Sequence, residues 1–60
     1  MMLTSKELTA IEEQLSAEQV LVKKYTQYAS ETNDNALKNK YNEIANKHKA
    51  HFGKLMSYLN

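Results

Sequence analysis

Two histidines three residues apart, His48 and His51, are the residues of this sequence whose types and spacing best suit chemistry. In a helix, this spacing places both imidazoles on one face, one turn apart. Together with a carboxylate, imidazoles are good ligands for iron, manganese or zinc. The pair therefore raises the question of whether it holds a metal or whether a small helical core has accommodated two polar side chains.

Apolar residues at alternating spacings of three and four predict the helices that position these histidines. The first seam consists of Leu8, Ile11, Leu15, Glu18, Val22, Tyr25 and Ala29. The second seam consists of Leu37, Tyr41, Ile44, His48, His51, Leu55 and Tyr58. Glu18, at the centre of the first seam, is its only charged member and is the carboxylate that could join the two histidines.

Capping and turn residues predict where the two helices begin and end. The segment from Thr4 to Glu7, TSKE, has the form of a capping box, so the first helix should begin at about Ser5. The cluster ETNDN favours a short connection, with Asn33 or Asp34 capping the second helix. We therefore expect an all-α fold with a single helical-hairpin domain over residues 1–60, with a helix at about 5–32, a turn at about 32–35 and a helix at about 35–58.

A connection this short makes the two helices antiparallel and fixes which residues lie side by side. Residues whose numbers sum to roughly 67 should be neighbours, given a fold-back at the middle of the turn cluster. This register places Glu18 beside His48.

The length of the chain predicts a homodimer. With 60 residues and no cysteine, a monomer would be marginally stable and has no disulfide to support it. A lone hairpin would also leave much of both apolar stripes exposed to water. Two hairpins related by a twofold axis would form a four-helix bundle with a closed core.

Composition argues against several classes of protein. The net charge is only +1 and arginine is absent, which argues against nucleic-acid binding. We find neither a secretory signal nor the roughly 18 apolar residues that a membrane span requires. We expect a soluble protein that is made in the cytoplasm and is not secreted.

The candidate metal ligands are Glu18, His48 and His51, and a twofold axis would double them to two glutamates and four histidines. The alternative is a structural pair of Glu18 and His48, with His51 pointing to the edge of the bundle. Both interpretations stay open on these residues alone. No cysteine nucleophile, glycine-rich phosphate loop or serine elbow is present, so we assign no catalytic residue.

The run EQVLVKKYTQYASETNDNALKNKYNEIANKHKAHFGKLMSYL resembles the spore coat protein F (CotF-like) family of endospore-forming bacteria. The most recognisable parts are the glutamate before KKYxxYA, the turn after it, and IAxKHxxHFxxL. Members of that family belong to the ferritin-like helical bundles. The resemblance therefore implies a ferritin-like four-helix bundle and a role in sporulation.

Ferritin-like proteins carry a glutamate on one helix and an ExxH motif on the next, and these residues bind two metal ions between four helices. By this resemblance, Glu18 matches the first glutamate and His51 matches the histidine of the motif. His48 stands where the motif has its second glutamate. The exchange removes negative charge from the site and argues against oxidase activity.

The leading expectation is a non-enzymatic structural or interaction protein of the spore coat type, which acts as a homodimeric helical bundle without a cofactor. Its further partners would be other spore coat proteins, and it would be assembled into the coat after synthesis in the cytoplasm. The alternative is a ferritin-like metal-binding protein that holds iron, manganese or zinc between two chains. Metal-dependent redox activity is the runner-up to a role without catalysis.

Overall fold

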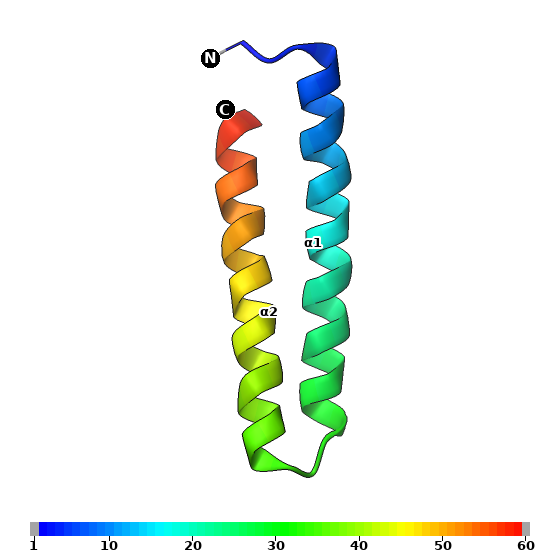
Figure 1. Ribbon diagram of the computed structural model, residues 1–60, viewed down its shortest axis with the longest axis vertical. Coiled ribbons are helices and arrows are strands. Elements are labelled where there is room, and N and C mark those ends of the chain that lie inside the picture. Colours follow the sequence, from blue (N-terminus) through cyan, green and yellow to red (C-terminus); the bar gives the residue numbers. More distant parts are fainter. Residues whose placement is uncertain (1, 60) are drawn as a thin grey trace.

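The computed structural model describes residues 2–59 and shows two antiparallel helices joined by a short turn (Figure 1). Helix α1 spans Ser5–Glu31, α2 spans Asn35–Met56, and a short 3-10 helix, η1, spans Ser57–Leu59. The predicted all-helical hairpin is confirmed. The chain after Met56 forms η1, where we expected the second helix to continue to about residue 58. Met1 and Asn60, the ends of the expected 1–60 domain, lie outside the described residues.

The predicted capping box starts α1. The Thr4 hydroxyl accepts a hydrogen bond from the Glu7 amide at 3.1 Å, and the Thr4 amide donates to the Glu7 carboxylate at 2.9 Å. The hydrogen bond from the Thr4 backbone, and then that from its side chain, holds the pKa of the Glu7 carboxyl below its ordinary value. Two of the amides that a helix start leaves unpaired are thereby satisfied.

The turn between the helices is held by its own polar side chains. The Asp34 carboxylate caps α2 by accepting from the Leu37 amide at 3.0 Å, which decides between the two caps that the sequence allowed. The Asp34 amide donates to the Thr32 hydroxyl at 3.1 Å. Since the turn is so short, the two ends of the hairpin lie together at the opposite end of the molecule (Figure 1).

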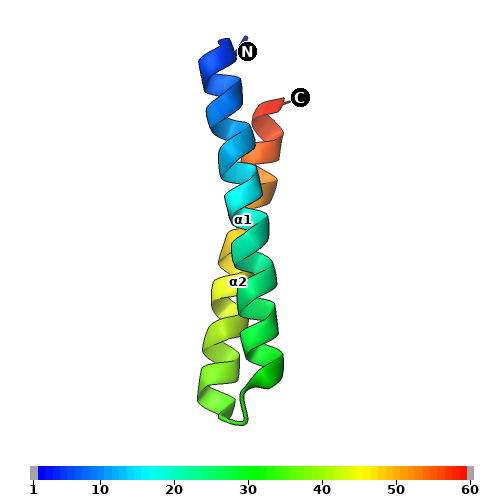
Figure 2. The same cartoon turned by 90° about the vertical axis from the view of Figure 1, so that its right-hand side faces the viewer.

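The two helices remain beside each other along the hairpin and cross at a shallow angle (Figures 1 and 2). The Nδ1 atom of His48 lies 2.8 Å from the Glu18 carboxylate, as the predicted register requires. Figure 1 shows that both helices run to the turn without a kink.

The hairpin buries very little. Within residues 2–59, the buried residues are Ala29, Ala45 and Glu18, and none of the large apolar side chains is fully covered. Seam residues toward the helix ends are exposed, as Leu8 and Leu37 illustrate at 40% and 44%. A single partner helix covers only a narrow strip of each seam, so the apolar periodicity exceeds what the hairpin itself can bury.

Gly53 lies on an open part of α2. A Cβ atom added there would have no side chain or distant backbone atom within 4 Å. It is thus a surface glycine and does not mark a close contact between helices. In the part of the chain that the structure describes, neither helix combines the length and hydropathy that crossing a bilayer demands.

Candidate functional site

The structure brings together all three residues that the sequence singled out as metal ligands. Glu18 lies in the middle of α1 and points toward α2, where His48 and His51 follow each other on one face. The Nδ1–H group of His48 donates to Oε1 of Glu18 at 2.8 Å. The Nδ1 atom of His51 lies 3.1 Å from Oε2 of the same carboxylate. One carboxylate from α1 therefore holds two imidazoles from α2.

The contact with Glu18 determines which nitrogen of the His48 ring carries hydrogen. An ionised carboxylate only accepts hydrogen bonds, so Nδ1 of His48 has to be the donor. The Nε2 atom is then the remaining nitrogen of this ring, able to accept a hydrogen bond in neutral histidine and to donate one in the charged form. Glu18 thus orients His48 as well as pairing with it.

The three side chains differ steeply in exposure, which shows how the cluster opens to solvent. The Glu18 side chain is 3% exposed, that of His48 22%, and that of His51 61%. A groove on this side of the hairpin is lined by Gln14, Glu18, His51, Lys54, Leu55 and Tyr58. Glu18 is thus reached from solvent past His51.

The cluster is complete as a hydrogen-bonded structural unit. Among the side chains described in residues 2–59, no buried nitrogen or oxygen lacks a hydrogen-bond partner. Burial of a carboxylate is costly unless hydrogen bonds and opposite charge offset the lost hydration. His48 supplies a hydrogen bond to one carboxylate oxygen, and His51 lies 3.1 Å from the other, so the structural interpretation of the cluster is physically sufficient.

The three side chains are also a candidate ligand set for a metal ion, which would take the place of the hydrogen between His48 and Glu18. One ligand atom from each of Glu18, His48 and His51 lies within 4.8 Å of the others. Ligands of a tetrahedral ion at about 2.0–2.2 Å are roughly 3.3–3.6 Å apart. The contacts of 2.8 and 3.1 Å end on different oxygens of Glu18, so the side chains would have to shift for one carboxylate oxygen and two ring nitrogens to meet a single ion. Three protein ligands would leave a position for water or for a ligand from another chain.

A cluster of tyrosines lies next to the site, toward the turn. The Tyr25 ring stacks on His48 with their centroids 6.4 Å apart, and its centroid lies 6.1 Å from that of Tyr41. Tyr28 contacts both tyrosines, at 5.6 and 5.5 Å between centroids. Along their helices, Tyr25 and Tyr41 are seven residues, about two turns, from Glu18 and His48. Because a tyrosine side chain is long, the Tyr25 ring reaches toward His48 and lies nearly parallel to the imidazole in an offset position.

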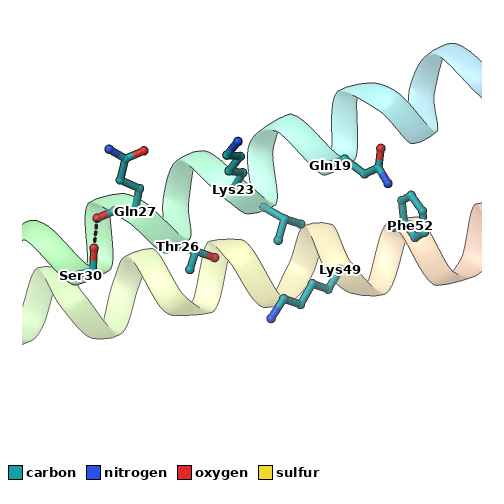
Figure 3. A pocket seen from close by; sticks show the side chains of 8 residues that line it. Gln19, Lys23, Thr26, Gln27, Ser30, Lys49 and Phe52 are labelled. Carbon is teal, nitrogen blue, oxygen red and sulfur yellow. Dashed lines mark hydrogen bonds between the residues drawn. The ribbon is translucent and has the colours of Figure 1, made fainter.

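The opposite side of the hairpin carries a wider groove without acidic residues or histidines in its lining (Figure 3). It is lined by Gln19, Val22, Lys23, Thr26, Gln27, Ser30, Lys49 and Phe52. The Ser30 hydroxyl donates to the Gln27 carbonyl at 2.7 Å at one end of this groove (Figure 3). Most of its lining surface is apolar, from Val22, Phe52 and the carbon chains of the longer side chains, and it offers no metal-ligand set.

Comparison with protein-family models gave no match, and comparisons with curated proteins and with solved structures gave no similar chain. What this protein does therefore has to follow from its own residues and contacts.

Proposed function

We propose that this chain is a non-enzymatic interaction protein whose hairpin pairs with a second copy to close a four-helix bundle. The observation that supports the proposal is the amount of apolar surface that the hairpin leaves exposed. The large apolar residues at or above 39% exposure are Met2, Leu8, Val20, Tyr28, Leu37, Met56, Tyr58 and Leu59. Leu8, Leu37 and Tyr58 among them belong to the predicted apolar seams, and an apolar seam that one partner helix leaves uncovered is typical of a contact site.

The energetics of a small helical protein support pairing. The hydrophobic effect contributes roughly 25 cal/mol per Å² of buried apolar surface, and the buried apolar residues here are two alanines, Ala29 and Ala45. A second hairpin would cover one long side of the first and supply the missing third and fourth helices. A twofold axis makes this contact self-complementary and limits it to two chains.

The resemblance to CotF-like proteins supports the biological setting of this proposal. It lies in KKYxxYA on α1 and IAxKHxxHFxxL on α2. In this proposal the bundle is ferritin-like, it belongs to the spore coat, and its outer surfaces bind other coat proteins. Pull-down of the tagged protein from sporulating cells tests this setting, and recovery of no coat protein would contradict it.

Sedimentation equilibrium at micromolar concentration tests the pairing itself. We expect twice the mass of one chain, with a mass that falls on dilution as two chains dissociate. A single-chain mass across the micromolar range would contradict the proposal.

Metal binding is a second candidate function, and the convergence of Glu18, His48 and His51 on one point favours it. A carboxylate and two imidazoles would hold zinc, iron or manganese, and iron or manganese would bring redox chemistry to the site. Glu18 would supply negative charge from the buried side. A metal ion would reach the site from solvent past His51, since the His51 side chain is the most exposed of the three.

Elemental analysis of the purified protein, with calorimetric titration of wild type and Glu18→Ala, tests this second function. Loss of Glu18 should lower the affinity for Zn²⁺ or Mn²⁺ by at least about tenfold, because it removes the only carboxylate ligand. Glu13→Ala is the matched control, since Glu13 is an exposed glutamate on the same helix. Equal affinity in wild type and Glu18→Ala would remove this site from consideration.

A further inference from the structure

The groove that Val22 and Phe52 line runs along the hairpin where a third helix lies in a helical bundle. Its lining on α1 extends from Gln19 to Ser30, which is about 17 Å at 1.5 Å per residue, or three turns of a helix. The groove has a volume of about 790 Å³, against about 330 Å³ for the groove beside His51. Its length and volume therefore suit one face of a further helix.

The floor of this groove is apolar. Val22 and Phe52 are both only half-buried in the hairpin, so part of their apolar surface faces the groove. The carbon chains of the longer lining residues add to this surface. An amphipathic helix buries apolar residues at spacings of three and four against a floor of this kind. The occupant should therefore carry an apolar stripe.

Two lysines border the floor, one from each helix. Lys23 extends from α1 and Lys49 from α2, in opposite directions (Figure 3). The lining contains no aspartate or glutamate, and within residues 2–59 neither lysine forms an ion pair. Acidic residues on both flanks of an incoming apolar stripe would each meet one ammonium group, as charges beside the seam do in coiled coils.

A second copy of the chain matches this groove less well. A twofold axis through the groove would bring Lys23 and Lys49 of both copies into one interface and would desolvate their charges. As an incoming helix, α2 would add further positive charge, because it carries five lysines and one glutamate. In α1, Glu7 and Glu18 already have partners within the chain.

We propose that this groove binds an amphipathic helix of another protein, with aspartate or glutamate on both flanks of its apolar stripe. The apolar side chains of that helix would cover Val22 and Phe52, and its carboxylates would pair with Lys23 and Lys49. Because a single hairpin forms the whole groove, this binding does not require the proposed dimer. It goes beyond the dimer by defining a partner of different sequence.

Two synthetic helical peptides of about 18 residues test the inference. Both carry the same leucine stripe, and its flanking positions are glutamate in one peptide and lysine in the other. Fluorescence anisotropy in about 0.15 M salt measures the dissociation constant of each peptide for the full chain. The glutamate peptide should bind at least about tenfold more tightly than the lysine peptide, and added salt should reduce the difference.

Reversing the charges in the groove should weaken binding of the glutamate peptide. Lys23→Glu/Lys49→Glu should raise its dissociation constant at least about tenfold. Lys24→Glu/Lys47→Glu is the matched control, because it changes the net charge equally at exposed lysines that are near in sequence but do not line the groove. The control should raise the constant less than about threefold. Circular dichroism checks that both variants remain helical.

Val22→Thr tests the apolar floor without a change of charge. It places a hydroxyl group in the groove on a side chain of similar size, and both peptides should then bind about threefold more weakly. This variant also covers the case that the charge-reversed chain fails to fold. Unchanged binding of the glutamate peptide to Val22→Thr would show that the floor is not used and would overturn the inference.

Equal binding of the two peptides to wild type, or an equal loss in the two double variants, would also overturn it. Sedimentation equilibrium tests the other occupant. Loss of a dimer in Lys23→Glu/Lys49→Glu, with no binding of the glutamate peptide to wild type, would assign the groove to a second copy and overturn the inference. A monomeric wild-type chain that binds the glutamate peptide would contradict the proposed dimer and support the groove as a site for another protein.

Discussion

Glu18 and Ala29 occupy the same seam of α1 and are almost equally buried, at 3% and 4% exposure, yet their surroundings differ. Glu18 lies at mid-helix, where His48 and His51 approach its two carboxylate oxygens. Ala29 lies in the half beside the turn, which also contains the cluster of Tyr25, Tyr28 and Tyr41. The chain therefore uses polar pairing at its centre and aromatic packing near its turn.

The two regions differ in how much stability is lost when a neighbouring side chain is removed. An apolar side chain that loses a contact leaves a cavity or exposed carbon, whereas a buried carboxylate that loses its donors keeps its full desolvation cost. Two residues that are equally buried can therefore differ in how much stability the protein loses when their neighbours are substituted. Substitutions at the polar centre should cost more than substitutions in the tyrosine cluster, although the tyrosines are larger.

The double variant His48→Ala/His51→Ala should show this contrast most strongly. It leaves the Glu18 carboxylate buried without either imidazole, which should lower the free energy of unfolding by about 3–5 kcal/mol. Urea denaturation at a fixed chain concentration measures the change. Adding Glu18→Leu to the double variant should restore most of the stability, because no charge is then stranded. A loss below about 0.5 kcal/mol in the double variant would show that the carboxylate is hydrated.

His48→Ala alone should have a smaller effect. It removes the 2.8 Å hydrogen bond but leaves His51 next to the carboxylate, so we expect a loss of about 2 kcal/mol. His51→Ala, at the more exposed imidazole, serves as the comparison and should cost less. The same denaturation curves rank the two variants, and a greater loss for His51→Ala would reverse the roles given to them here.

Tyr41→Leu probes the other half of the hairpin. It removes two ring contacts, to Tyr25 and Tyr28, and retains an apolar side chain, so the expected loss is about 1 kcal/mol. Thermal or urea unfolding measures it. If this variant loses more than the His48→Ala/His51→Ala double variant, the polar centre is not the more sensitive region.

The cap of α1 should depend on pH through the exposed carboxylate of Glu7, because this carboxylate accepts a hydrogen bond from Thr4. The pKa of Glu7 is lowered by its hydrogen bonds with Thr4, so its capping contribution is present above 4.5, the ordinary value, and is lost as the pH falls through the lowered pKa. The first turn of α1 should then fray, with the Thr4 amide signal shifting in NMR titration. Glu7→Gln should abolish this shift, and an unchanged titration in that variant would assign the shift to another group.

Local rules were enough to predict the parts of the fold that depend on near neighbours in sequence. The capping box was predictable because Thr4 and Glu7 are three residues apart, and the turn cluster limited the second cap to Asn33 or Asp34, of which the structure uses Asp34. The approach of His48 to Glu18 followed from a turn too short to allow another register.

Side-chain reach and exposure were not predictable in the same way. The contact of His51 with Glu18 depends on the rotamers of both side chains, and the stacking of Tyr25 on His48 depends on how far its ring extends. Periodicity identified Leu37 as a seam residue but could not show that the hairpin leaves it exposed. Apolar periodicity marks the residues that are suited to burial. It does not tell which of them the single hairpin buries and which stay exposed.

Native mass spectrometry of the freshly purified protein tests whether the chain forms a dimer without bound metal, because one spectrum gives both the number of chains and the metal content. We expect a particle of two chains without stoichiometric metal, in which His48 and His51 pair with Glu18 in each chain. A single chain at micromolar concentration would contradict the dimer. Two chains that retain stoichiometric iron or manganese would contradict the non-metal role and make metal binding the function of the cluster.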